Sequence, residues 1–148
     1  MSDWDQRFMK LARHIATWSK DRGRKVGSVI VGPDNEIRST GYNGIPRGVR
    51  DDVEERHSKE TKEKYVWCAH AERNAIYNAA RIGVSLKGCR VYSTLYPCSD
   101  CVIALIQSGL TELVTTEPDF NDPQWGEGYK RAKIMLEEAG VKVRFSNE

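Results

Sequence analysis

The chain has 148 residues, 39% of them hydrophobic, and 23 Lys and Arg against 21 Asp and Glu give a formal net charge of +2. This length is enough to bury one core and is short for two ordinary domains, so we expect a single domain over residues 1–148. A nearly neutral chain with dispersed basic residues lacks the electrostatic footprint of a nucleic-acid-binding protein, and we expect no nucleic acid as a partner. The sequence has neither an apolar run of membrane-spanning length nor an N-terminal signal segment. It therefore predicts a cytoplasmic protein with reduced cysteines and no membrane partner.

The first residues carry the pattern of an amphipathic helix. Apolar residues recur at spacings of three and four from Trp4 to Trp18, and Ser2 or Asp3 is placed to cap the N-terminus. The aromatic side chains of this stripe are interpreted as core packing and not as ligands.

Two strands and a long irregular segment follow. Residues 26–31 and 36–42 are predicted strands, and the sequence Gly-Pro-Asp-Asn at 32–35 favours a hairpin between them. Residues 44–64 combine Pro, Gly and a run of mixed charges, which is typical of a solvated loop with a short exposed helix.

The rest of the chain alternates helices and strands. Three more strands are predicted at 90–95, 112–116 and 141–145. Helices are predicted from His70 to near Gly83, from the Cys98 to Cys101 segment to near Gly109, and over about 128–139. Strands that alternate with helices at this spacing pair in parallel, with helices on both faces of the sheet. We therefore expect an α/β fold, a three-layer α/β/α sandwich with a mixed five-stranded sheet.

One constellation in the sequence indicates a catalytic metal. His70, Cys98 and Cys101 offer one imidazole and two thiolates, a ligand set that leaves the fourth tetrahedral position of zinc open. All three stand at predicted helix N-termini, whose partial positive charge favours the thiolate form of cysteine. Zinc lowers the pKa of water at the open position to about 7. Glu72 is therefore predicted to take the proton of that water and pass it to a substrate nitrogen, with one catalytic Zn²⁺ per chain.

Two other interpretations of the cysteines stay open from the residues alone. A Cys-x-x-Cys sequence in an intracellular protein is often a redox pair. A structural zinc site would need a fourth ligand, which Cys68 or Cys89 could supply. The carboxylate of the His-x-Glu sequence and the proline before the first cysteine, Pro97, favour catalysis over both.

Asn43 ends the second predicted strand in a Tyr-Asn-Gly sequence. Its side-chain amide can meet a sugar hydroxyl or the edge of a base, so Asn43 is a candidate substrate contact. The alternative is that Asn43 only shapes a turn.

Four stretches of the sequence resemble those of the deoxycytidylate (dCMP) deaminases. They are Gly-Tyr-Asn-Gly-Ile-Pro-Arg-Gly at 41–48, Asp-Asp at 51–52, His-Ala-Glu-Arg-Asn-Ala-Ile at 70–76 and Thr-Leu-Tyr-Pro-Cys-Ser-Asp-Cys at 94–101. The likeness runs from about residue 18 to residue 145. A His-x-Glu with Pro-Cys-x-x-Cys is the signature of zinc nucleobase deaminases, in which the glutamate is the acid and base. The Gly-Tyr-Asn-Gly-x-Pro loop narrows the resemblance to the deoxycytidylate branch.

The resemblance implies a cytidine deaminase-like fold and the zinc-dependent hydrolysis of dCMP to dUMP with release of ammonia, which would supply thymidylate synthesis. It implies that Val26 and Tyr96 line the substrate pocket and that the backbone amide of Ala71 holds the pyrimidine carbonyl. In related deaminases aromatic residues after the fourth strand often close over the base, here Phe120 and Trp125, although each could equally be packing.

A nucleotide substrate also needs a partner for its phosphate. Guanidinium groups form bidentate charge-assisted hydrogen bonds to phosphate oxygens, so Arg24 and Arg47 are candidates, with Lys25 as a point charge. The residues alone do not choose among them.

The resemblance further implies a homo-oligomer, a hexamer in many relatives, with dCTP and dTTP as effectors and Mg²⁺ accompanying a bound nucleoside triphosphate. Two alternatives stay open: dCTP as an additional substrate, and a tRNA-type adenosine or cytidine deaminase. The latter should need more phosphate contacts than this nearly neutral chain offers. Some relatives hold a second, structural zinc ion, which is not expected here because the chain has only three histidines.

Overall fold

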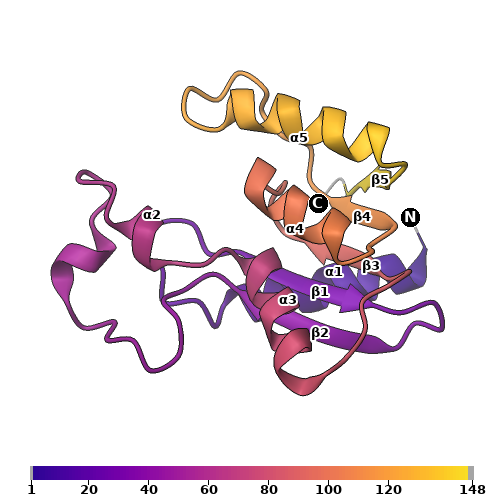
Figure 1. Ribbon diagram of the computed structural model, residues 1–148, viewed down its shortest axis with the longest axis horizontal. Coiled ribbons are helices and arrows are strands. Elements are labelled where there is room, and N and C mark those ends of the chain that lie inside the picture. The colour runs from indigo at the N-terminus through magenta and orange to yellow at the C-terminus, as the bar shows by residue number, and fades with distance from the viewer. Residues whose placement is uncertain (1, 147–148) are drawn as a thin grey trace.

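One mixed sheet forms the centre of the protein in the computed structural model, which describes residues 2–146 (Figure 1). Its strands are β1 (Gly27–Val31), β2 (Ile37–Tyr42), β3 (Arg90–Ser93), β4 (Glu112–Thr115) and β5 (Lys142–Phe145). They lie in the order β2-β1-β3-β4-β5. β1 is antiparallel to both β2 and β3, whereas β3, β4 and β5 run parallel. The predicted mixed five-stranded sheet is confirmed.

Helices cover both faces of this sheet. Their bounds are α1 (Asp3–Ala16), the short 3₁₀ helix η1 (Glu54–His57), α2 (Lys64–Trp67), α3 (Ala71–Ile82), α4 (Ser99–Gln107) and α5 (Gly126–Glu138). α1 packs on one face, where Phe8, Met9, Ala12 and Ile15 meet apolar side chains of β1, β3 and β4. α3, α4 and α5 share the other face around a second apolar cluster. The expected three-layer sandwich is therefore the observed one, and among residues 2–146 we find no helix both long and apolar enough to span a bilayer.

The first helix begins as predicted and ends earlier. Ser2 caps α1, because its hydroxyl accepts the backbone N–H of Asp5 while the Asp5 carboxylate accepts the backbone N–H of Ser2. The prediction that the whole aromatic stripe is core packing was wrong. Trp4 and Trp18 are 43% and 54% exposed, since α1 ends at Ala16 and the helix buries only its central stripe.

The segment between β2 and α3 projects from the body of the protein (Figure 1). It is largely exposed and contains η1 and the single turn of α2, as the sequence predicted. Its base is closed by two backbone hydrogen bonds between Gly44 and Ala69, 2.9 and 3.0 Å long. The chain therefore enters α3 at a fixed position, directly before His70.

A buried ion pair ties the first helix to the last strand. Arg144 on β5 donates two hydrogen bonds to the Asp5 carboxylate, 2.6 and 3.0 Å long, and the hydroxyl of Tyr92 on β3 donates a third. The side chain of Asp5 is only 4% exposed. The Arg144 guanidinium holds the pKa of Asp5 far below its usual range, against the opposing effect of burial.

Replacing Asp5 with asparagine is expected to lower the free energy of unfolding by about 2–4 kcal/mol, because Arg144 loses its buried partner. A depressed pKa stabilises the fold fully above the usual carboxyl pKa of about 4, and this stabilisation is lost as the pH falls below it. The difference between wild type and Asp5→Asn in urea unfolding should therefore shrink from pH 7 toward pH 3. Asp52→Asn, which removes a pair that is exposed on both sides, should change stability by less than about 1 kcal/mol. A difference for Asp5→Asn that does not change with pH would contradict this account.

Candidate metal centre

Two helix N-termini converge on one point beside the sheet. His70 is the N-cap of α3 and Cys98 is the N-cap of α4, while Cys101 lies in the first turn of α4. The side chain of His70 makes no capping hydrogen bond to α3, and its Nδ1 atom instead meets the sulfur of Cys98. Helix N-termini carry partial positive charge and favour thiolates nearby.

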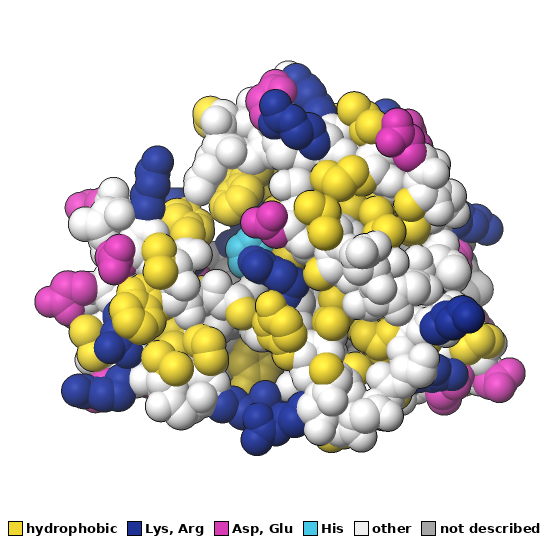
Figure 2. Space-filling model, viewed as in Figure 1, with side chains coloured by type: hydrophobic (Ala, Val, Ile, Leu, Met, Phe, Trp, Pro, Cys, Tyr) yellow, Lys and Arg dark blue, Asp and Glu magenta, His cyan; other side chains and the backbone are white. Residues whose placement is uncertain are grey.

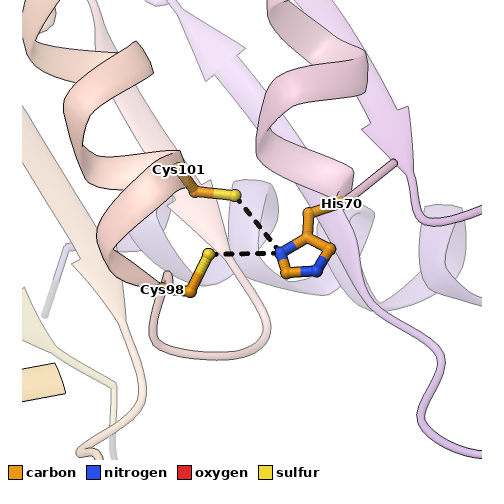
Figure 3. Close-up of side chains that lie close together, drawn as sticks. All are labelled: His70, Cys98 and Cys101. Carbon is orange, nitrogen blue, oxygen red and sulfur yellow. Dashed lines mark hydrogen bonds between the residues drawn. The ribbon is translucent and has the colours of Figure 1, made fainter. Parts of the chain in front are cut away.

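The three predicted ligands face one another in Figure 3. The Nδ1 atom of His70 lies 3.3 Å from the Cys98 sulfur and 3.4 Å from the Cys101 sulfur. A tetrahedral zinc ion with ordinary bond lengths separates such N and S atoms by about 3.6 Å, so the donor set fits zinc after a small outward movement. Within residues 2–146 this metal-ligand cluster has three members, and neither Cys68 nor Cys89 belongs to it. The geometry thus favours a three-ligand site over a closed structural one.

The three side chains of the cluster shift one another's pKa values in directions that favour negative charge on one sulfur, which suits the binding of a cation. A hydrogen bond from Cys101 lowers the pKa of Cys98 to about 4, with His70 acting in the same direction and burial opposing. The hydrogen bond to Cys98 together with burial raises the pKa of Cys101. The Cys98 sulfur raises the pKa of His70 against the effect of burial. These shifts favour the thiolate form at Cys98 over Cys101.

Arg73 follows Glu72 on α3 and supports the charge of the sulfurs. Burial alone would lower the pKa of Arg73, but the sulfur atoms of Cys101 and Cys98 raise it overall. A cation beside two zinc-bound thiolates offsets part of their negative charge.

Glu72 is the buried carboxylate of the site. It lies in the first turn of α3 and is 3% exposed. Its Oε1 atom accepts a hydrogen bond from the hydroxyl of Ser93, the last residue of β3. In the part of the chain that the structure describes, it does not belong to the cluster of possible metal ligands. Sequence reasoning missed Ser93, because it lies 21 residues away from Glu72 in the chain.

A cavity of about 210 Å³ opens beside this cluster. Figure 2 shows the molecular surface hollowed on this face, with a histidine side chain in the hollow and apolar, basic and acidic side chains around it. Eight of the residues predicted for the site line this cavity: Arg24, Val26, Asn43, His70, Ala71, Glu72, Tyr96 and Cys98.

Two predicted residues of the cavity are buried as expected of a pocket wall. Val26 and Tyr96 are 8% and 3% exposed. Trp125 lines the cavity beside the metal ligands, with its ring centroid 6.1 Å from that of His70. Phe120 packs against Tyr96 at 6.5 Å instead, which corresponds to the packing alternative.

The phosphate candidates differ in position. Arg24 lines the cavity, whereas Arg47 and Lys25 are exposed residues that are not part of its lining in the described chain. Two lysines that the sequence analysis did not single out, Lys59 and Lys64, also line it. They belong to the projecting segment, and only the folded chain brings that segment against the cavity.

The amide of Asn43 makes long-range contacts within the chain. Its Oδ1 atom accepts the backbone N–H of Val26 at 2.9 Å, and its Nδ2 atom donates to the carbonyl of Arg24 at 2.9 Å and to the Asp21 carboxylate at 3.3 Å. Asp21 in turn is paired with Lys64 at 2.8 Å. Asn43 thus lines the cavity and at the same time holds the segment that carries Arg24, which is closer to a shaping role than to a free substrate contact.

Close packing of α3 on the sheet depends on Gly41 in β2. A Cβ atom at this position would lie 2.4 Å from both the carbonyl oxygen of Ala71 and the backbone nitrogen of Ala75. We expect Gly41→Ala to lower the free energy of unfolding by about 2–3 kcal/mol or more and to reduce zinc retention, because α3 must move with His70 and Glu72. Thermal unfolding and zinc analysis measure this effect. Gly44→Ala is the control, since a Cβ atom there meets nothing within 4 Å. Equal stability of the two variants would contradict the argument.

An imidazole and two sulfurs at paired helix N-termini, with a buried glutamate that is not a ligand, define a zinc-dependent nucleobase deaminase. The family model of the cytidine and deoxycytidylate deaminase zinc-binding region matches residues 2–117. The chain belongs to this family of deaminases.

Similar proteins extend the comparison over nearly the whole chain. The human deoxycytidylate deaminase is 37% identical over 145 residues, which cover 96% of this chain and 79% of that protein. A protein of Aliivibrio fischeri described as an uncharacterized deaminase in the luxG 3′ region is 38% identical, with 97% and 93% covered. The crystal structure of the dCMP deaminase from cyanophage S-TIM5 in complex with dCMP and dUMP has a TM-score of 0.78 at 23% identity, with 99% of each chain covered, and it shares the fold.

Proposed function

We propose that the protein hydrolyses dCMP to dUMP and ammonia in the cytoplasm, through one deaminase domain over residues 1–148. The observation that carries the proposal is that His70 and Cys98 of the His70, Cys98 and Cys101 cluster line one cavity together with the buried carboxylate of Glu72. The names of the relatives, most of them deoxycytidylate deaminases, support dCMP as the substrate.

Zinc held by His70, Cys98 and Cys101 would supply the Lewis acidity that makes hydroxide available near neutral pH. Glu72 then takes a proton from the attacking water and delivers it to N3 of the cytosine ring as the new C–O bond forms at C4. It passes the second proton of the water to the exocyclic nitrogen, so that the C4–N bond breaks and ammonia leaves. The backbone N–H of Ala71 holds the ring carbonyl, while Val26 and Tyr96 bound the base and exclude bulk water. Each transfer is a step of general acid and base catalysis.

Arg24 is the proposed phosphate partner. It is exposed and lines the cavity together with Asp122, whose pKa is lowered first by backbone hydrogen bonds from Trp125 and Gln124 and further by the charge of Arg24. A phosphate would compete with Asp122 for this guanidinium and gain bidentate hydrogen bonds. Lys64 is engaged by Asp21, which leaves Arg24 and Lys59 as the available cations of the lining.

A substrate panel tests the proposal. Ammonia release should be fastest with dCMP, compared with deoxycytidine, CMP, cytidine and dCTP. Arg24→Ala should raise the KM for dCMP about 10–100-fold, the range expected for a lost charge-assisted hydrogen bond, and leave that for deoxycytidine unchanged. Arg47→Ala is the matched control, since Arg47 lies outside the cavity lining. A preference for free nucleosides would overturn the phosphate assignment, and no ammonia from any substrate would overturn the function.

The proposal extends to regulation and assembly. A second cavity of about 330 Å³ shares Asp21, Asn43 and Lys64 with the first and is also lined by Trp18, Lys20, Arg22, Tyr42 and His57. Lys20 and Arg22 are held in exposed ion pairs with Asp51 and Glu54, which a triphosphate could displace, and with the aromatic side chains they support dCTP and dTTP as effectors there, with Mg²⁺ on the triphosphate. We also propose a homo-oligomer, a hexamer, because the sequence resembles deoxycytidylate deaminases, many of which are hexamers. Sedimentation with and without dCTP tests both.

A further inference from the structure

Ser93 is the one buried hydroxyl that contacts Glu72 in the described chain. It ends β3 with its residue 0% exposed, and its Oγ atom donates to Glu72 Oε1 at 2.5 Å. The carbonyl oxygen of Leu95 lies 2.9 Å from the same Oγ atom on the backbone side. The single O–H of Ser93 can donate fully to only one of these two acceptors, and the shorter contact to a carboxylate, the stronger acceptor, favours Glu72 over the carbonyl of Leu95.

On the face of the sheet that carries Ser93, the side chains change from apolar to hydroxyl-bearing between one row and the next. One row across β1, β3 and β4 consists of Ile30, Val91 and Leu113, which pair in register and belong to the apolar core under α3 and α4. The next row on the same face has hydroxyls. Ser28 pairs with Ser93 across β1 and β3, and Thr115 follows Val114, the partner of Tyr92.

All three hydroxyl residues are 0% exposed, and the hydroxyls of Ser28 and Thr115 have no partner within the described chain. A buried hydroxyl without a partner is destabilising, so packing alone does not account for this row. Through Ser93 this row borders the carboxylate of Glu72, and a buried carboxylate meets less of a desolvation penalty beside a hydroxyl than beside an aliphatic side chain. Only the central member, Ser93, reaches the carboxylate.

We propose that Ser93 is the positioning residue for Glu72: its hydroxyl fixes Oε1, so that Oε2 is turned toward the reacting atoms. This inference rests on the deaminase reaction proposed above. A glutamate side chain has three torsions, and proton transfer requires it to lie within hydrogen-bond reach of water and ring nitrogen in turn. Loss of an orienting partner of this kind typically reduces activity 10–100-fold.

Three substitutions at position 93 test the role. Ser93→Ala should lower kcat for dCMP about 10–100-fold, with KM, zinc content and the Kd for the product dUMP changed less than about threefold. Ser93→Thr and Ser93→Val have nearly the same shape and differ in the hydroxyl. The threonine variant should keep kcat at least tenfold above that of the valine variant, whatever the added methyl group does to both.

Ser39→Ala provides the matched control. Ser39 is a buried serine of β2 whose hydroxyl donates to the carbonyl of Ala75 on the same helix, α3, at 2.6 Å, away from the metal site. It should leave kcat within about threefold of wild type. Equal kcat for the threonine and valine variants, or a Ser93→Ala variant no slower than Ser39→Ala, would overturn the inference. Wild-type turnover and its loss in Glu72→Gln, measured on the same substrate, show separately whether the proposed function holds.

Discussion

Replacing Glu72 with glutamine is expected to lower kcat for dCMP by at least about 10²–10⁴-fold while the protein keeps its zinc. General acid and base catalysis alone has this magnitude, and a neutral amide cannot accept the proton of the attacking water. The substitution preserves side-chain size, and the amide oxygen can still accept the hydrogen bond from Ser93. His70, Cys98 and Cys101 are not changed. Ammonia release and zinc analysis of the same preparation measure the two quantities.

Glu60→Gln is the control for removing one negative charge, because Glu60 is an exposed residue of the projecting segment. It should deaminate dCMP at the wild-type rate within about twofold. A Glu72→Gln variant with near-native turnover would remove Glu72 from the mechanism. A variant that lost zinc would instead assign Glu72 a part in holding the metal, against the geometry of the cluster.

Local sequence patterns were sufficient for the metal ligands and for the order of the elements. His70 and Cys98 precede apolar runs of helical spacing, and both became helix N-caps because that is where such patterns begin. The first and last residues of the helices were harder to predict where tertiary contacts decide them. α5 begins at Gly126, two residues before the predicted start, because Asp122 accepts the backbone N–H groups of Gln124 and Trp125 and so orders the preceding turn.

The rest of the site depends on contacts between distant segments. Ser93 lies 21 residues from Glu72, and Asp21 lies 43 from Lys64, and no local pattern links either pair. The same applies to Arg24, whose place in the lining relies on the hydrogen bonds of Asn43. Helix periodicity likewise predicted Trp4 and Trp18 to be buried, because periodicity shows which residues share a face and not how far the covering sheet extends.

Zinc binding to the metal-free protein is expected to strengthen steeply with pH between about pH 6 and pH 8. The ligands must be deprotonated, so metal binding releases the protons that the free site holds. The pKa of Cys98 is lowered by the hydrogen bond from Cys101 and by His70, so Cys98 is the ligand that contributes least to this pH dependence. His70 and Cys101 have raised pKa values and retain protons that zinc must displace, and lower pH therefore favours the metal-free form. Competition with a chromophoric chelator across this range measures the apparent Kd, and proton release into a weak buffer gives the number of protons displaced.

Cys98→Ser should abolish tight binding, and with it turnover, since serine remains protonated. Cys68→Ser, which alters a thiol outside the cluster, should bind zinc with the wild-type pH dependence. An apparent Kd that stays constant from pH 6 to pH 8 would show that zinc does not bind through these groups.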